Sequence, residues 1–160
     1  MKIVNIIVAV LLSTLSLNAT DDCIMVQELS VEFKNDSTAY VNNEQEMLKI
    51  KEFKDFVTQT NLFVLIEGHT NKIFSADHNI ELSTKRAVKV MNKLISLGLK
   101  KSQVRAMGFG ESSPLYDNNT EDGLAKNRRV IAEVFNSAND LNQYVQDQQA
   151  RIKPILHNEQ

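Results

Sequence analysis

Three features are scarce in this chain of 160 residues, and each scarcity excludes a class of protein. The single cysteine, Cys23, cannot form a disulfide bond within the chain. Basic residues are not in excess, since 18 Lys and Arg stand against 20 Asp and Glu, so the chain lacks the positive charge typical of nucleic-acid binding. The apolar run at residues 3–17 is shorter than the roughly 20 residues of a membrane-spanning helix.

Catalytic and metal-binding motifs are missing as well. The sequence contains no His-Glu-x-x-His helix, no Gly-x-Ser-x-Gly turn and no phosphate-binding loop. His69, Asp77 and His78 lie close together in the sequence, but their spacing matches no established set of zinc ligands. We therefore expect neither an enzyme nor a bound metal or cofactor, and we interpret His69 as a structural histidine.

The first residues are a candidate targeting signal. Lys2 precedes the apolar run 3–17, and Ala19 offers a small residue for cleavage, which is the layout of a secretory signal peptide. We predict a signal peptide at 1–19, followed by a short N-terminal segment at 20–26. The alternative keeps the leader uncleaved as an inner-membrane anchor.

Strand and helix patterns alternate along the domain predicted at 27–136. Period-2 alternation and short apolar runs predict strands at 27–33, 62–66, 104–109 and 129–135. Helical spacing of apolar residues predicts two long helices between them, at 44–59 and 79–97. This order is typical of an α/β fold with helices packed on a sheet, in which the long helices form βαβ crossovers.

Helix ends are marked by capping residues. Asn43, with Glu46 three residues later, resembles a capping box, and Gly98 stands where a left-handed C-cap belongs. The polar stretch 118–126 is expected to form a loop with at most one helical turn. In the C-terminal segment, 137–160, a last helix is expected to end before Pro154. Its apolar stripe is thin, so it either docks weakly on the domain or binds a partner protein.

One face of the second long helix carries the most specific chemistry. Asn79, Leu82 and Arg86 are spaced i, i+3, i+7, so they share a face near the start of the helix. That face looks towards the loop 68–79, which follows a buried strand. A guanidinium beside the N–H groups of a helix start is suited to bind a carboxylate. These residues therefore predict a carboxylate receptor.

Four motifs in this region resemble a known family. They are Gly-His-Thr-Asn at 68–71, Leu-Ser-Thr-Lys-Arg-Ala at 82–87, Gly-Phe-Gly-Glu at 108–111 and Asn-Arg-Arg at 127–129. Together they resemble the OmpA-like peptidoglycan-binding domains of outer-membrane protein A, peptidoglycan-associated lipoproteins and flagellar stator proteins. The resemblance covers roughly 29–135. It implies a βαβαβ-β sandwich with a four-stranded mixed sheet and a C-terminal helix, located in the periplasm and associated with the outer membrane or cell wall.

The resemblance also implies a ligand. In that family, an aspartate after His-Thr and the arginine of the second motif hold the zwitterionic end of meso-diaminopimelate, an amino acid of the peptidoglycan stem peptide. The arginine is present as Arg86, but the aspartate is replaced by Asn71 and a usual glycine by Phe74. Asn71 brings no charge to an ammonium group, so we expect weaker binding. Asp77, in the same loop, is a candidate substitute.

Each candidate also has a purely structural interpretation. Arg86 can pair with Asp77 or Glu81 on the surface, Asn79 can cap the helix, and Arg129 can brace the fold. The predicted ligand-binding residues are Arg86, Asn71, Asn79, Leu82, Thr70, Asp77 and Arg129.

Two functions follow from the resemblance. The first is a module that binds peptidoglycan without making or breaking a bond. The second is a structural or interaction subunit of an envelope complex that has lost or weakened this binding and contacts another envelope protein through the C-terminal helix. A murein hydrolase is a third and weaker interpretation, because the sequence offers no nucleophile or acid–base pair.

Overall fold

The computed structural model describes residues 28–157. The predicted signal peptide, the segment 20–26 and the last three residues lie outside this range. Within it, strands and helices alternate in the order β1 (Ser30–Glu32), α1 (Asn43–Thr60), β2 (Phe63–His69), α2 (Ala76–Ser96), the short 3-10 helix η1 (Lys101–Gln103), β3 (Val104–Gly110), α3 (Glu121–Asn127), β4 (Arg129–Phe135) and α4 (Ala138–His157).

The four strands form one mixed sheet in the order β1-β4-β2-β3. β2 and β3 are parallel and are joined through α2, whereas β4 runs antiparallel to both of its neighbours, β1 and β2. The expected α/β fold with a four-stranded mixed sheet is therefore confirmed. In the described part of the chain, no helix combines the length and apolarity needed to cross a membrane.

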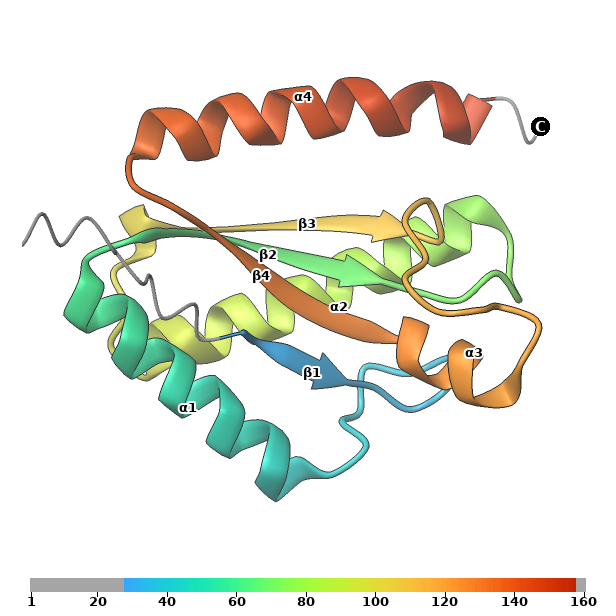
Figure 1. Cartoon of the computed structure of the whole chain (residues 1–160), viewed down its shortest axis with the longest axis horizontal. Helices are drawn as coiled ribbons and strands as arrows, with labels where there is room; N and C mark the ends of the chain where they lie inside the picture. Colours follow the sequence, from blue (N-terminus) through green and yellow to red (C-terminus); the bar gives the residue numbers. More distant parts are fainter. Residues whose placement is uncertain (1–27, 158–160) are drawn as a thin grey trace, which may run out of the picture.

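Helices cover both faces of the sheet (Figure 1). α1 and α2 lie against one face, and α4 lies along the other. β2 is buried on both faces, because Val64 and Ile66 pack with α1 and α2 while Leu65 packs with α4. This two-sided burial explains why residues 62–66 form a continuous apolar run instead of an alternating one.

The start of α2 lies directly against the ends of β2 and β3. A Cβ atom at Gly68 would overlap the carbonyl oxygen of Ser83, so only glycine permits this approach. The hydroxyl of Ser83 also accepts a hydrogen bond of 3.0 Å from the backbone N–H of Gly110. These contacts hold the polar face of α2 beside the loop that follows β2.

α2 begins one turn earlier than the sequence predicts. Ser75 is its N-cap, and the Ser75 hydroxyl accepts a hydrogen bond from the backbone N–H of His78. The predicted start at residue 79 is wrong, because this cap satisfies an N–H of the first turn and extends the helix into the loop. Asn79 therefore lies inside the helix, and the interpretation of Asn79 as a cap is wrong too.

Other boundaries differ by less. The N-cap of α1 is Asn42 instead of Asn43, since the Asn42 side chain accepts the N–H of Gln45. Residues 121–127 form the helix α3 where a polar loop with at most one helical turn is predicted, because the Thr120 side chain caps the helix by accepting from the N–H of Gly123. The predicted left-handed C-cap at Gly98 is confirmed by a φ of 105°.

The last helix is longer and better packed than expected. α4 continues through Pro154 to His157, so the predicted end before Pro154 is wrong. A proline removes one N–H donor and crowds the carbonyl four residues earlier, which disfavours a helix without always ending it. Leu141 and Ile152 are almost fully buried against Leu65 and Phe109 of the sheet. Among the α4 side chains that the structure describes, up to Ile152, the thin apolar stripe is therefore covered by the sheet.

This packing predicts that α4 contributes strongly to stability. Leu141→Ala removes a buried side chain and should lower the free energy of unfolding in urea by about 2–5 kcal/mol. The control is Leu48→Ala on α1, where the side chain is 57% exposed and a change within about 0.5 kcal/mol is expected. Equal small changes in both variants would show that α4 is not firmly docked.

Candidate ligand-binding site

A small pocket lies where the loop after β1, the loop after β2 and the start of α2 meet. It has no room for a water molecule, and the roughly 160 Å³ between its atoms consists of narrow gaps and open solvent at its mouth. The lining residues are Asn35, Asp36, Thr70, Asn71, Phe74, Asn79, Leu82, Arg86 and Arg128. The structure thus brings together five of the seven predicted ligand-binding residues and places Asp77 and Arg129 elsewhere.

Arg86 is the most deeply buried charged group of the pocket, with 0% of its surface exposed. Its Nε donates to the carbonyl of Ser37 at 2.9 Å, Nη2 to that of Lys34 at 2.9 Å, and Nη1 to that of His69 at 3.4 Å. The surface alternative for Arg86 is wrong, because Glu81 instead pairs with Lys85 at 2.5 Å. The guanidinium therefore joins two backbone segments, the loop after β1 and the end of β2, to its own helix α2.

The charge of Arg86 persists in spite of this burial. Burial, with a smaller contribution from the nearby charge of Arg128, lowers the pKa of Arg86 to about 10, while Asp36 opposes the shift. The guanidinium is therefore cationic at neutral pH. With Arg128 also lining the pocket, two cations face the space that a ligand would enter.

Asn71 is held by bonds from both ends of its amide. Its Oδ1 accepts the backbone N–H of Ile73 at 3.3 Å, and its Nδ2 donates to the carbonyl of Leu124 in α3, also at 3.3 Å. The side chain is buried. It thus ties the loop after β2 to α3, and both of its polar atoms take part in the protein's own hydrogen bonds.

Two buried polar atoms of the pocket have no hydrogen-bond partner among the described residues. They are Oγ1 of Thr70 and Oδ1 of Asn79. The amide nitrogen of Asn79, in contrast, donates to the carbonyl of Phe74 at 2.9 Å and to the carboxylate of Glu111, which lies behind it. Buried polar atoms are rarely left unpaired, and these two oxygens have lone pairs that can accept further hydrogen bonds.

The other two predicted residues lie away from this pocket. Asp77 is exposed in the first turn of α2. Arg129 begins β4 and lines a separate groove together with Tyr116 and Glu133. Its guanidinium donates to Asn127 and to the carbonyl of Ser113, as expected for a residue that braces the fold. The roles of both residues in ligand binding stay predictions.

Three further lining residues, Asn35, Asp36 and Arg128, are not among the predicted ligand-binding residues. Asp36 follows β1, and its carboxylate lies 2.7 Å from Nε2 of His78. Arg128 donates to the carbonyls of Phe33 and Leu124. The sequence did contain a signal that Arg128 and Arg129 point to different sites. Alternation at the start of β4 places neighbouring residues on different sides of the sheet.

Comparison with known proteins identifies the family. The family model of the OmpA family matches residues 32–128. The chain belongs to the OmpA family. Outer membrane porin F of Pseudomonas fluorescens is 40% identical over 110 residues, which are 67% of this chain and 32% of that protein. Peptidoglycan-binding protein ArfA of Mycobacterium tuberculosis is 32% identical over 105 residues, 62% of this chain and 30% of that protein.

A solved structure agrees with this assignment. The peptidoglycan-associated lipoprotein of Burkholderia pseudomallei has a TM-score of 0.62 and 26% sequence identity, covering 66% of this chain and 89% of that one. The chain spans about a third of the length of the two relatives named above. The family assignment therefore concerns the OmpA domain and not the whole of those longer proteins.

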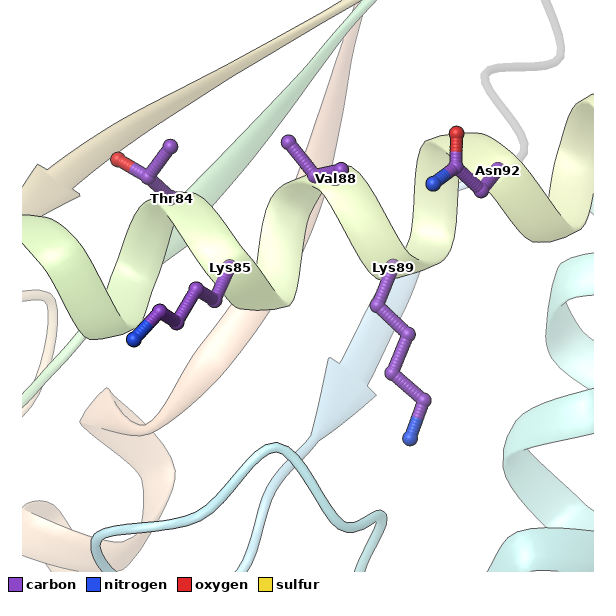
Figure 2. A pocket seen from close by; sticks show the side chains of 5 residues that line it. All are labelled: Thr84, Lys85, Val88, Lys89 and Asn92. Atoms are coloured by element: carbon purple, nitrogen blue, oxygen red, sulfur yellow. The ribbon is translucent and has the colours of Figure 1, made fainter.

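Elsewhere on this OmpA domain, a shallow hollow runs along the outer side of α2 (Figure 2). It is lined by Thr84, Lys85, Val88, Lys89 and Asn92, all from one helix. Its two cations already have partners, because Lys85 pairs with a neighbouring glutamate and Lys89 donates to a backbone carbonyl at 2.7 Å. The described residues also contain no cluster of His, Cys, Asp and Glu that would hold a metal ion. We therefore assign no site to this hollow.

A buried ionisable cluster lies behind the pocket, under α4. His69 stacks on Phe109, its Nε2 lies 3.6 Å from the carboxylate of Glu67, and neither ring nitrogen has a hydrogen-bond partner among the described residues. Burial lowers the pKa of His69, partly offset by Glu67. The carbonyl of the same residue accepts from Arg86, so this cluster and the pocket share a backbone position.

The position of Arg86 predicts that lysine cannot replace it. A single ammonium cannot reach three carbonyls on two separate segments, so Arg86→Lys should lower the free energy of unfolding by about 1.5–3 kcal/mol. The control is Arg105→Lys, because Arg105 is exposed and donates only to the adjacent carbonyl of Val104. Urea denaturation of both variants measures this difference. If both variants lost equally little stability, the hydrogen bonds of Arg86 to the three carbonyls would not hold the fold as inferred.

The lowered pKa of His69 predicts a loss of stability in acid. Below about pH 6.5 the unfolded chain binds a proton at this residue that the folded protein does not, so stability falls as pH falls. One proton corresponds to at most about 1.4 kcal/mol per pH unit. His69→Gln should flatten this dependence between pH 7 and 5 in urea titrations. An unchanged slope would mean that the pKa of His69 is the same in the folded and unfolded protein.

Proposed function

We propose that this OmpA domain binds peptidoglycan non-covalently in the periplasm. The observation that carries the proposal is the pocket at the end of β2, which gathers Thr70, Asn71, Asn79, Leu82 and Arg86. Membership of the OmpA family and the likeness to a peptidoglycan-associated lipoprotein support it. The ligand would be the free end of diaminopimelate in the stem peptide.

The chemistry of the pocket suits such a zwitterion. Two guanidinium groups supply positive potential for the carboxylate. The unpaired oxygens of Thr70 and Asn79 would accept hydrogen bonds from the ammonium. Leu82 would contact the aliphatic part of the ligand. Recognition needs no bond to be made or broken, and we propose no catalytic role for any of these residues.

Admission of the ligand requires movement of side chains at the mouth. The pocket as it stands has no room even for a water molecule, and Phe74 occupies the position where the family usually has glycine. The ring of Phe74 packs against the imidazole of His78, with centroids 4.9 Å apart. We propose that Phe74 swings outward when the amino-acid end of a stem peptide enters.

A second candidate function is an interaction subunit of an envelope complex with weakened peptidoglycan binding. The observation that favours it is Asn71, which is neutral and uses both ends of its amide within the protein. The predicted docking element, α4, has its apolar stripe covered by the sheet. A partner protein would therefore contact the exposed polar side of α4, which is rich in Gln and Asn.

Sedimentation with purified sacculi tests the first function. The domain should pellet with sacculi that contain meso-diaminopimelate and be released by the free amino acid. Thr70→Val, which removes only a hydroxyl, should weaken binding roughly two- to tenfold, corresponding to about 0.5–1.5 kcal/mol. Its folding stability should not fall, because the hydroxyl has no partner among the described residues.

The control for this experiment is Thr58→Val on α1, which lies away from the pocket and should leave sedimentation unchanged. If the unaltered domain stays in the supernatant with diaminopimelate-containing sacculi, peptidoglycan binding is refuted and the interaction subunit is favoured.

A further inference from the structure

The pocket needs an anion if it is to bind an ammonium group, and position 71 does not supply one. Of the nine residues that line the pocket, two are arginines and one, Asp36, is a carboxylate. Asp77, the substitute suggested by the sequence, is exposed and lies outside the lining. The carboxylate of Glu111 lies behind Asn79 and is bonded to its amide.

Asp36 is held at the pocket by the same guanidinium that forms its base. Arg86 donates to the carbonyls of Lys34 and Ser37, which flank the short segment containing Asp36. Asp36 itself has a φ of 41°, a left-handed conformation that turns the loop sharply at this point. The clamp therefore fixes the backbone on both sides of the carboxylate.

A second contact orients the side chain. One carboxylate oxygen of Asp36 lies 2.7 Å from Nε2 of His78, in the first turn of α2. The Asp36 side chain is about half exposed, so a ligand entering from solvent would reach it without a change of fold. The carboxylate thus lies at the edge of the pocket, where it links the loop after β1 to α2.

We propose that Asp36 is the anion that receives the ligand's ammonium group, in place of the aspartate that Asn71 replaces. This inference rests on the proposed binding of diaminopimelate. The ammonium would lie beside Asp36 at the mouth, and the neighbouring carboxylate would lie near Arg86 and Arg128. Asp36 would therefore determine the preference for a zwitterionic end over a carboxylate alone.

Two matched peptides test this assignment by calorimetry. One is L-Ala-γ-D-Glu-meso-diaminopimelate, and the other carries 2-aminopimelate at the third position, which keeps the distal carboxylate but lacks the distal ammonium. The unaltered domain should prefer the first peptide on the order of tenfold, because a charge-assisted hydrogen bond is lost with the second.

Asp36→Asn should abolish this preference by weakening only the diaminopimelate peptide. Asparagine tolerates a left-handed conformation, so the loop is expected to keep its shape. Asp147→Asn, on the exposed side of α4 and away from the pocket, is the matched control and should keep the full preference. Adding Asn71→Asp to Asp36→Asn should restore the preference, because it returns a carboxylate to the pocket.

The outcomes separate the two proposals. If the unaltered domain binds neither peptide, the proposed function fails and this inference fails with it. If it binds both with the expected preference and Asp36→Asn keeps that preference, the function stands and the role of Asp36 is refuted. If Asp36→Asn weakens both peptides equally, Asp36 only shapes the loop and the inference is again overturned.

Discussion

The pocket depends on one buried guanidinium. Arg86 donates to backbone carbonyls from the loop after β1 and from the end of β2, while its own backbone belongs to α2. A charged donor that leaves water must satisfy its N–H groups, and here main-chain oxygens do so. Three segments that are far apart in sequence are therefore fixed around one point. The same charge that assembles the pocket also gives it a positive potential.

The sequence predicts the fold well where local patterns decide it. The continuous apolar run at 62–66 predicts a strand buried on both faces, and Leu65 does contact α4 on one face while its neighbours contact α2 on the other. The i, i+3, i+7 spacing of Asn79, Leu82 and Arg86 places all three at one pocket. The predicted helix ends are wrong where a single capping residue sets the end, as at Ser75, or where a helix continues through a proline, as in α4.

The site is only partly predictable, because part of it is assembled by long-range contacts. Asp36 reaches the pocket through a loop whose conformation is fixed by Arg86, fifty residues away, and no local pattern in the sequence reveals that pairing. Which of Arg128 and Arg129 lines the pocket can be predicted from the sequence, because the alternation that continues into β4 places neighbouring residues on opposite sides of the sheet. Arg129 shares a strand face with Glu133 beneath α4, where burial raises the pKa of that carboxyl. Polar residues on this face leave α4 with fewer apolar partners, which accounts for its thin stripe.

Asn71 changes the balance of charge in the pocket more than its geometry. A carboxylate at this position would face the carbonyl of Leu124, to which the amide now donates. The amide of Asn71 therefore links the loop after β2 to α3 by a hydrogen bond. Arg128 donates to the same carbonyl. The pocket then contains two guanidinium groups and a single carboxylate, that of Asp36. With an aspartate at 71 it would be neutral, whereas with asparagine it carries an excess positive charge. If the pocket binds the proposed zwitterion, this excess charge would favour the ligand's carboxylate and leave recognition of its ammonium to Asp36 in the loop after β1.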